Sequence, residues 1–251
     1  MTTDGIGFVG HATLLVELGG TRLLTDPLLR KSLAHVRRRV PLPPLEELLP
    51  LDAVLVSHAH ADHLDPYSLR KVARGCPVIA PAGCGGILRR AGMRQVIELG
   101  LHERVDVGGL TVEALPALHD GRRYPVGPPM LAVGFLVEGP VSVYFAGDTD
   151  LFDGMAELAG RVDVAALPIW GWGPKLPAGH LNPETAAEAL ELIRPATALP
   201  IHWGTLRSLG AQRGADPVEP ARRFAANAAR LTPETAVRVV LPGERLELAA
   251  R

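Results

Sequence analysis

Short apolar runs separated by glycine, proline and polar residues fill the 251-residue chain, and their periodicity changes along it. Near the N-terminus the runs are short and β-type, and the Gly19-Gly20 pair between two of them indicates a hairpin turn. Further on, strand-like runs alternate with segments whose apolar residues recur at helical spacing. We expect helices capped by Asp65, Asn182 and Asp216, because each of these residues precedes a proline and an amphipathic segment.

The order of these elements predicts the fold class. A group of predicted strands is followed by alternating strands and helices, and this order of elements occurs twice along the chain. We therefore expect an α/β protein with two similar halves that face each other sheet on sheet, with helices outside. Residues 30–50, basic and then proline-rich, are predicted as a long surface loop, and residues 236–248 as a closing hairpin. No shift in composition marks a linker, so we expect one domain over residues 1–251.

The stretch VSHAHADHLD carries the densest group of chemically active side chains. His58 and His60 follow a predicted buried strand, and extended backbone points side chains two apart in the same direction. Asp62 and His63 come where the chain turns toward the next helix. Four ligands at this spacing do not fit one ion comfortably, so the stretch favours two ions over one. The alternative to a metal site is a polar turn of solvated side chains. Imidazole and carboxylate ligands suit zinc, and also manganese and iron.

Three distant residues complete the candidate ligand set. His119, Asp148 and His202 each follow a predicted strand, where α/β folds place functional side chains. The alternative for each is a buried polar group with an ordinary hydrogen-bond partner. A structural zinc site is usually closed and rich in cysteine, whereas these candidates are histidine and aspartate only. The set therefore favours a catalytic metal.

The motifs SHAHADH, PALH, AGDT and PIHWGT, in this order, resemble the metal-binding motifs of the metallo-β-lactamase superfamily. GHATLLVELGGTRLLTDP and GHLNPETAAEAL resemble the branch that contains N-acylphosphatidylethanolamine-hydrolysing phospholipase D and ascorbate-6-phosphate lactonase. The resemblance covers nearly the whole chain and implies a four-layer αβ/βα sandwich with the site at one edge. It also implies a first metal held by His58, His60 and His119, a second held by Asp62, His63 and His202, and Asp148 bridging both.

Two divalent ions in such a site, Zn²⁺ first and Mn²⁺ or Fe²⁺ as alternatives, share a water and lower its pKa toward about 7. The resulting hydroxide attacks a carbonyl carbon or a phosphorus, which predicts a hydrolase of an ester, lactone or phosphodiester bond in a small soluble substrate. Asp62 is expected to orient the water or accept its proton. His180, just before a helix, is a candidate to bind an anion or protonate the leaving group; the alternative is a helix-entry histidine without a role.

Several further residues have open interpretations. His11 is a candidate for the floor of the site or for a structural hydrogen bond. The tryptophans at 170, 172 and 203 could wall the substrate or simply fill the core. Three arginines at 37–39 could recognise a phosphate or carboxylate, although a solvated basic loop is the simpler interpretation. His35 and His102 are expected at the surface.

Bulk properties exclude other function classes. The formal net charge is −1, from 26 basic and 27 acidic side chains, so no global field steers the protein to nucleic acid. The strongest apolar run, at 130–137, is too short to span a bilayer, and the N-terminus lacks a signal peptide, so we expect a cytoplasmic protein without a membrane partner. Cys76 and Cys84 are expected as inert thiols. The alternatives are a nuclease-type phosphodiesterase, a mononuclear iron oxygenase and a non-catalytic binding protein; the oligomeric state stays open.

Overall fold

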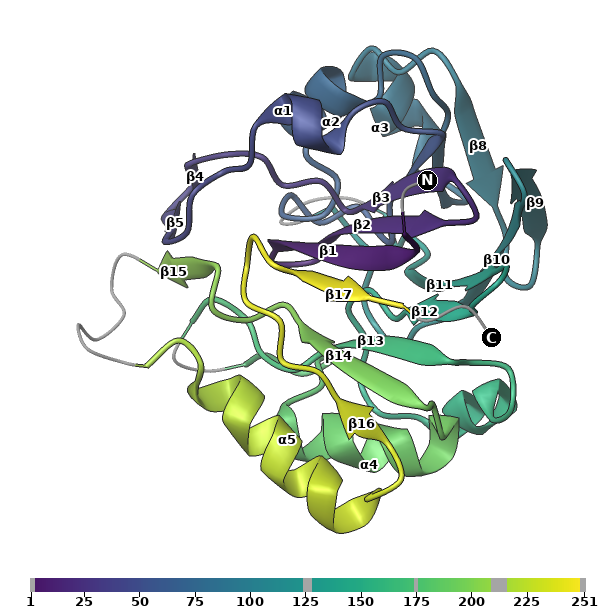
Figure 1. The fold of residues 1–251 in the computed structure, drawn as a ribbon. Coiled ribbons are helices and arrows are strands. Elements are labelled where there is room, and N and C mark those ends of the chain that lie inside the picture. Colours follow the sequence, from purple (N-terminus) through teal and green to yellow (C-terminus); the bar gives the residue numbers. More distant parts are fainter. Residues whose placement is uncertain (1–2, 124–127, 174–175, 209–215, 249–251) are drawn as a thin grey trace.

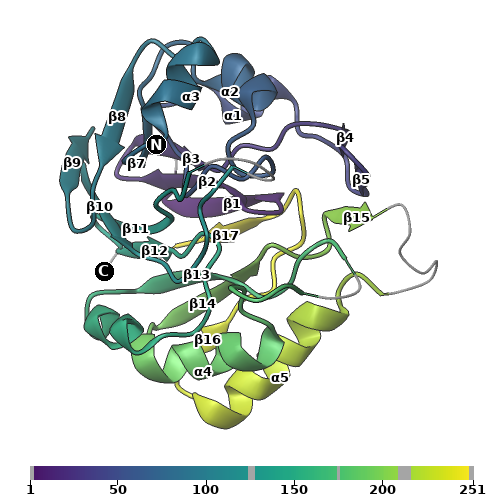
Figure 2. The same cartoon turned by 180° about the vertical axis from the view of Figure 1, so that it is seen from behind.

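Two mixed β-sheets lie face to face in the computed structural model, with helices on the outer side of each (Figures 1 and 2). This arrangement confirms the predicted αβ/βα sandwich. A third, small sheet stands at one edge of the molecule. The structure describes residues 3–123, 128–173, 176–208 and 216–248.

The first sheet is antiparallel at one end and parallel at the other. The predicted hairpin turn joins two of its strands, and Gly19 and Gly20 both take positive φ there, at 55° and 85°. In spatial order the sheet consists of β17 (Arg245–Glu247), β1 (Gly5–Gly10), β2 (Thr13–Leu18), β3 (Thr21–Thr25), β6 (Ala53–Leu55), β7 (Val78–Pro81) and β8 (Val96–Leu99).

The second sheet repeats this plan, with parallel pairing from β12 to β16 and antiparallel pairing from β9 to β12. The apolar faces of the two sheets meet in the main core. In spatial order it consists of β16 (Ala236–Val237), β14 (Thr197–Ile201), β13 (Val164–Pro168), β12 (Val143–Phe145), β11 (Val133–Glu138), β10 (Leu110–Pro116) and β9 (Arg104–Val107). The small sheet consists of β15 (Leu206–Ser208), β5 (Val36–Arg38) and β4 (Ser32–Leu33).

Two of the three predicted helix caps are confirmed. Asp65 accepts hydrogen bonds from two backbone N–H groups, and Asn182 forms a capping box with Thr185. The cap at Asp216 was wrong: its carboxylate accepts from the N–H of Val218 in a local turn, and the helix begins three residues later. The helices are α1 (Leu45–Leu48), α2 (Pro66–Val72), α3 (Gly85–Arg90), the 3₁₀ helix η1 (Asp153–Leu158), α4 (Pro183–Ile193) and α5 (Glu219–Leu231).

Two other predictions about the chain path were also wrong. Residues 236–248 do not form a hairpin, because β16 joins the second sheet while β17 pairs with β1 at the edge of the first. Pairing with β1 covers an edge that would otherwise expose free backbone groups. The long loop at 30–50 contains β4, β5 and α1 rather than being irregular throughout.

Buried polar groups in and around the second sheet are satisfied unequally. Burial acts to raise the pKa of Glu113, but the hydrogen bonds and charges of Arg161 and Arg104 outweigh it and lower that pKa. The fully buried Tyr144 hydroxyl has no hydrogen-bond partner among the described residues.

The two cysteines lie in the smaller core beside the first sheet. Cys76 and Cys84 are free and buried, and burial raises their pKa values to about 11 and about 12, which fits inert thiols.

Candidate metal centre

The candidate ligands gather because the strands that precede them end at the same side of the molecule. His58 follows β6 of the first sheet, while His119, Asp148 and His202 follow β10, β12 and β14 of the second. Side chains beyond the carboxyl ends of parallel strands meet at one edge of a sheet. The centre therefore lies where the two halves of the sandwich face each other.

The chain between His58 and His63 is a turn and not a continued strand. β6 ends at Leu55, the backbone bends at Ala59, and the N–H groups of His63 and Leu64 both donate to the carbonyl of His60. The expectation that extended backbone aligns His58 and His60 was therefore wrong. The turn still brings the two imidazole rings within 4.5 Å of each other, measured between centroids.

All seven predicted ligands lie in two groups whose candidate donor atoms are within 4.8 Å of one another. Asp148 lies between the groups: its Oδ2 is 3.2 Å from His63 Nε2 and 4.0 Å from His58 Nε2, and its Oδ1 is 3.3 Å from His202 Nε2. One group contains His58, His60, His119 and Asp148, and the other contains His11, Asp62, His63 and His202.

The donor set fits divalent cations. Within the described part of the chain, four buried atoms at this point have no hydrogen-bond partner: Nε2 of His58, His63 and His202, and Oδ1 of Asp148. Buried polar atoms are almost always satisfied, so four orphaned donors or acceptors aimed at one place need an explanation. Imidazole nitrogens with carboxylate oxygens are ligands for zinc, manganese or iron, and a bound cation would satisfy these atoms.

Most of the imidazoles are held neutral, as metal ligation requires. Burial lowers the pKa of His58 well below its ordinary value, and it lowers the pKa values of His11 to about 3 and His119 to about 4. His63 differs: burial acts to lower its pKa, but the carboxylates of Asp148, Asp26 and Asp62 together raise it well above the ordinary value. This excess of negative charge around His63 also favours a cation.

Hydrogen bonds at Nδ1 fix the orientation of several histidines and leave Nε2 toward the centre. Nδ1 of His119 lies 2.8 Å from the carbonyl oxygen of Gly179, and Nδ1 of His202 lies 2.6 Å from the carbonyl oxygen of Trp170. Such outer contacts select the tautomer and aim the ring.

Asp26 gives His63 the same support and was missed by the sequence analysis. It is fully buried after β3, its Oδ2 lies 2.7 Å from His63 Nδ1, and its carboxylate accepts from both the N–H and the hydroxyl of Ser57. Its position at a strand end was the available signal, the same one that identified His119.

Two side chains converge on Asp62. His11 Nε2 lies 3.0 Å from Asp62 Oδ2, and the indole N–H of Trp172 donates to the same oxygen at 3.3 Å. The centroid of the His11 ring lies 3.9 Å from that of His202, so His11 lies beside the candidate ligands. Trp203, in contrast, is buried in the main core, where its indole donates to a backbone carbonyl.

His180 reaches the centre from the segment before α4. Its Nε2 lies 3.4 Å from Asp148 Oδ2, and its ring is 4.7 Å from that of His119. The side chain keeps 14% of its surface exposed, so it faces both the centre and solvent. This position suits a residue that contacts a substrate.

Comparison with known proteins identifies the family. A model described as a β-lactamase superfamily domain matches residues 21–203. The chain belongs to the metallo-β-lactamase superfamily. Like the relatives named for that activity, this superfamily member is a metal-dependent hydrolase, and the histidine and aspartate cluster described above is its metal-binding region.

Individual relatives agree with this assignment. A metal-dependent hydrolase from Opitutus terrae is 33% identical over 96% of this chain and 98% of its own. The N-acyl-phosphatidylethanolamine-hydrolyzing phospholipase D 1 of Caenorhabditis elegans is 34% identical over 79% of this chain, a match that spans only 63% of that relative. Among solved structures, a metallo hydrolase from Ignicoccus hospitalis superposes with a TM-score of 0.72 at 25% identity, over all of both chains.

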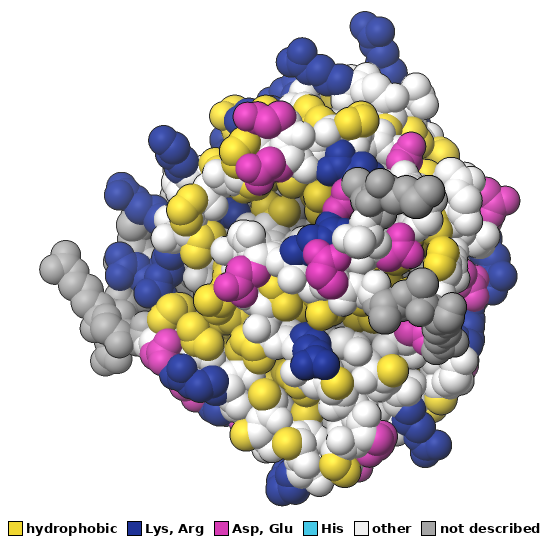
Figure 3. Space-filling model, viewed as in Figure 1, with side chains coloured by type: hydrophobic (Ala, Val, Ile, Leu, Met, Phe, Trp, Pro, Cys, Tyr) yellow, Lys and Arg dark blue, Asp and Glu magenta, His cyan; other side chains and the backbone are white. Residues whose placement is uncertain are grey.

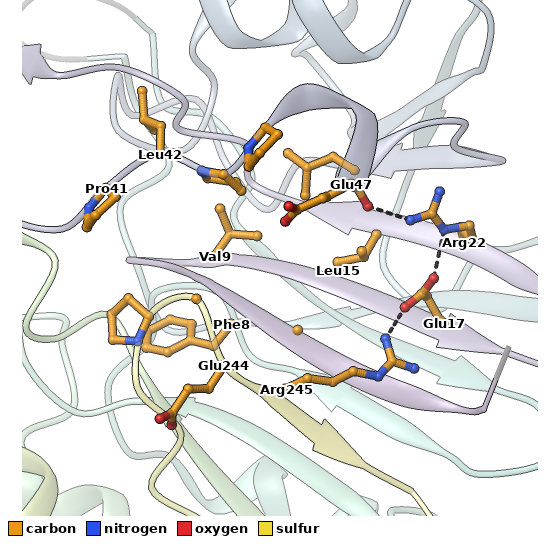
Figure 4. A pocket seen from close by; sticks show the side chains of 16 residues that line it. Phe8, Val9, Leu15, Glu17, Arg22, Pro41, Leu42, Glu47, Glu244 and Arg245 are labelled. Carbon is orange, nitrogen blue, oxygen red and sulfur yellow. Dashed lines mark hydrogen bonds and ion pairs between the residues drawn. The ribbon is translucent and has the colours of Figure 1, made fainter.

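A separate groove of about 530 Å³ lies on the outer side of the first sheet (Figure 4). It is bounded by β1, β2, the proline-rich segment 41–44 and the turn before β17. Glu17 lies between Arg22 and Arg245 along one side and pairs with both. The groove includes none of the candidate ligands. Among the described residues, no helix combines the length and apolar character needed to cross a membrane.

Proposed function

We propose that this superfamily member is a dinuclear hydrolase that cleaves an ester, lactone or phosphodiester bond of a small substrate. The observation that supports this most is that the Nε2 atoms of His58, His63 and His202, which have no hydrogen-bond partner among the described residues, all face Asp148, whose Oδ1 also lacks one. In this proposal His58, His60 and His119 would hold the first ion, and Asp62, His63 and His202 would hold the second. Asp148, which lies between the two groups, would be a ligand to both.

Divalent ions bound there would supply Lewis acidity and lower the pKa of a water toward about 7. The chain's own residues then have separate tasks. The carboxylate of Asp62 accepts the proton of the attacking water, and His11 and Trp172 fix its orientation through their contacts with Oδ2. His180, on the solvent side of Asp148, donates a proton from Nε2 to the leaving oxygen as its bond to carbon or phosphorus breaks.

The proposal can be tested in two steps. Protein purified without added metal is first analysed for metal content, and two equivalents of zinc, manganese or iron per chain are expected. A single iron per chain would instead favour an oxygenase. The protein is then assayed on p-nitrophenyl esters, lactones and phosphodiesters with zinc and with manganese, and on an N-acylphosphatidylethanolamine to test the activity of the nematode relative.

Variants separate the site from the scaffold. His60→Ala and Asp148→Ala should abolish hydrolysis, whereas His102→Ala, an exposed histidine, should leave it unchanged. His180→Ala should lower kcat while the metal content stays the same as in the parent protein. Full activity in either His60→Ala or Asp148→Ala would show that the ligand assignment is wrong.

A further inference from the structure

The PIHWGT motif ends in a residue that the proposed metal centre does not use. Thr205 stands between β14 and β15, is fully buried and is not a candidate ligand. Its Oγ1 accepts from the N–H of His11 at 2.7 Å and donates to the carbonyl of Trp203 at 3.2 Å. Because Thr205 and His11 are 194 positions apart in the sequence, the first of these hydrogen bonds joins the two halves of the molecule.

The backbone of His11 is held from two directions. Its N–H donates to Thr205, and its carbonyl accepts from the N–H of His202 at 2.8 Å. Both histidines take a positive φ, 60° at His11 and 64° at His202, which is unfavourable for residues other than glycine. Such a conformation persists only where the surrounding contacts impose it. The hydroxyl of Thr205 is one of the contacts that impose it at His11.

The two segments are closely fitted at this point. Gly10 has a φ of 119°, and a Cβ there would lie 2.8 Å from both Oγ1 and Cγ2 of Thr205. Glycine therefore lets the hydroxyl reach the next N–H along the chain. Water cannot take the place of the hydroxyl, because Thr205 is fully buried and His11 is only 1% exposed, beneath the apolar and charged side chains that cover the molecule in Figure 3.

The backbone held in this way aims the imidazole ring of His11 at the metal centre. Nε2 of His11 lies 3.0 Å from Oδ2 of Asp62, and the ring centroid lies 3.9 Å from that of His202. Asp62 and His202 are both candidate ligands of the second ion. Thr205 is therefore connected to these ligands through one intermediate, the His11 ring.

We propose that Thr205 is a positioning residue: its hydrogen bond to the N–H of His11 holds the imidazole against Asp62 and thereby sets the affinity and geometry of the second metal site. The inference rests on the proposed function for the identity of that site. Removal of the hydroxyl leaves the N–H of His11 buried without this acceptor, which is costly. The carbonyl of Trp203 still accepts from the N–H of Thr205 itself at 2.7 Å, so the change isolates a single contact.

Two substitutions separate the hydrogen bond from the packing. Thr205→Val keeps the shape of the side chain and removes the hydroxyl, whereas Thr205→Ser keeps the hydroxyl and removes the methyl group. Thr21→Val is the matched control, because Oγ1 of Thr21 also accepts from a backbone N–H between the sheets, that of Gly109 at 3.3 Å. Thr21 begins β3 and Asp26 follows the other end of that strand, so the control lies away from the centre.

The first measurement follows the His11 ring in metal-free protein by NMR with isotope-labelled histidine. We expect a hydrogen-bonded Nε2–H signal from His11 in the parent, in Thr205→Ser and in Thr21→Val, and we expect Thr205→Val to lose it. Urea unfolding shows that each variant is folded under these conditions. If Thr205→Val does not fold, Thr205→Ala, which also removes the hydroxyl, takes its place in the comparison with Thr205→Ser.

The second measurement is the zinc affinity of each site, by competition with a chromophoric chelator, together with the absorption spectrum of protein loaded with Co²⁺. Thr205→Val should weaken the second site about tenfold and change the Co²⁺ spectrum, while the first site and the control keep the parent values. In a His11→Gly background, where glycine accepts the positive φ and no ring remains, Thr205→Val should cause no further loss of zinc affinity.

Three results would overturn the inference: a His11 signal and zinc affinities that Thr205→Val leaves unchanged, an equal loss in Thr205→Ser, or a further loss of affinity in the His11→Gly background. A parent protein that binds zinc at neither site, but whose His11 signal depends on the Thr205 hydroxyl, would contradict the proposed function and leave the positioning of His11 standing. Two bound ions that are unaffected by Thr205→Val would do the reverse.

Discussion

Asp26 offers the sharpest test of how the centre is supported, because it contacts a candidate ligand without being one itself. We consider Asp26→Asn, which keeps the shape of the side chain and replaces one carboxylate oxygen with an amide. In the parent, Oδ1 accepts from the N–H of Ser57 at 2.7 Å, while Oδ2 accepts from the Ser57 hydroxyl at 2.5 Å and lies 2.7 Å from His63 Nδ1. Asparagine preserves the first contact and reverses the polarity at the position of Oδ2.

The magnitude follows from which partner can adjust. The hydroxyl of Ser57 can rotate and accept from the new amide, so that contact survives. His63 is fully buried and cannot turn without leaving the centre, so its Nδ1–H would face the amide N–H. Losing a hydrogen bond to a charged acceptor costs about 1.5–3 kcal/mol. Because contacts of this kind tune metal binding, we expect the affinity of the site that contains His63 to fall about 10-fold to 100-fold.

Competition between the protein and a chromophoric chelator for zinc measures this affinity for each site. The first site, with His60 and His119, should keep its affinity. Asp52→Asn is the matched control, since Asp52 also accepts from a backbone N–H but lies outside the centre. Urea unfolding of the metal-free protein shows whether the fold is retained. Unchanged zinc affinity at both sites in a folded Asp26→Asn protein would refute the reasoning.

Three shorter predictions concern the scaffold. Glu113→Gln should remove the stability that the Glu113 carboxylate contributes through Arg161 and Arg104. This contribution is fully present above the ordinary glutamate pKa of about 4.3 and is lost as pH falls through the lower pKa of the folded state. Urea unfolding should therefore show that the variant is less stable by about 1–3 kcal/mol at pH 7 and equally stable in acid. Tyr144→Phe should raise the free energy of unfolding by about 1 kcal/mol, since it deletes a buried hydroxyl without a partner among the described residues, whereas the exposed Tyr67→Phe should not. Gly147→Ala should lower the melting temperature and weaken zinc binding, because φ is +62° there and the new Cβ would lie 2.7 Å from Ser57 Cβ; unchanged values would contradict the assigned strain.

Features set by neighbours in sequence were predictable. The caps at Asp65 and Asn182 and the turn at Gly19-Gly20 depend on contacts within a few residues, which the local pattern contains. The cap at Asp216 failed for a related reason, because the same carboxylate can bond either to a helix N–H or to a turn N–H, and only the folded chain selects one. The extent of the domain, 1–251, stays a prediction.

Features set by distant contacts were not predictable from the pattern. The pairing of β17 with β1 joins Glu247 to Gly5, and two adjacent β-type runs near the C-terminus look the same whether they pair with each other or with other strands. The role of Asp26 is similar, since its partners Ser57 and His63 lie 31 and 37 residues away. The seven candidate ligands were found because a motif and strand-end positions identify them without knowledge of their contacts, although their ligand role stays a proposal.

The origin of the ligands has a consequence for how the two halves depend on each other. His58, His60, Asp62 and His63 come from the first half, and His119, Asp148 and His202 come from the second, so neither half holds either group of ligand atoms alone. Without a cation, Asp148 and three imidazoles with free Nε2 atoms are buried at the junction, which opposes the packing of the halves. A cation that binds only the assembled site stabilises it in proportion to its affinity and concentration. In the metal-free protein these buried polar atoms weaken the junction between the two halves. Because the same atoms are the candidate ligands, metal binding and the packing of the two sheets are one coupled equilibrium.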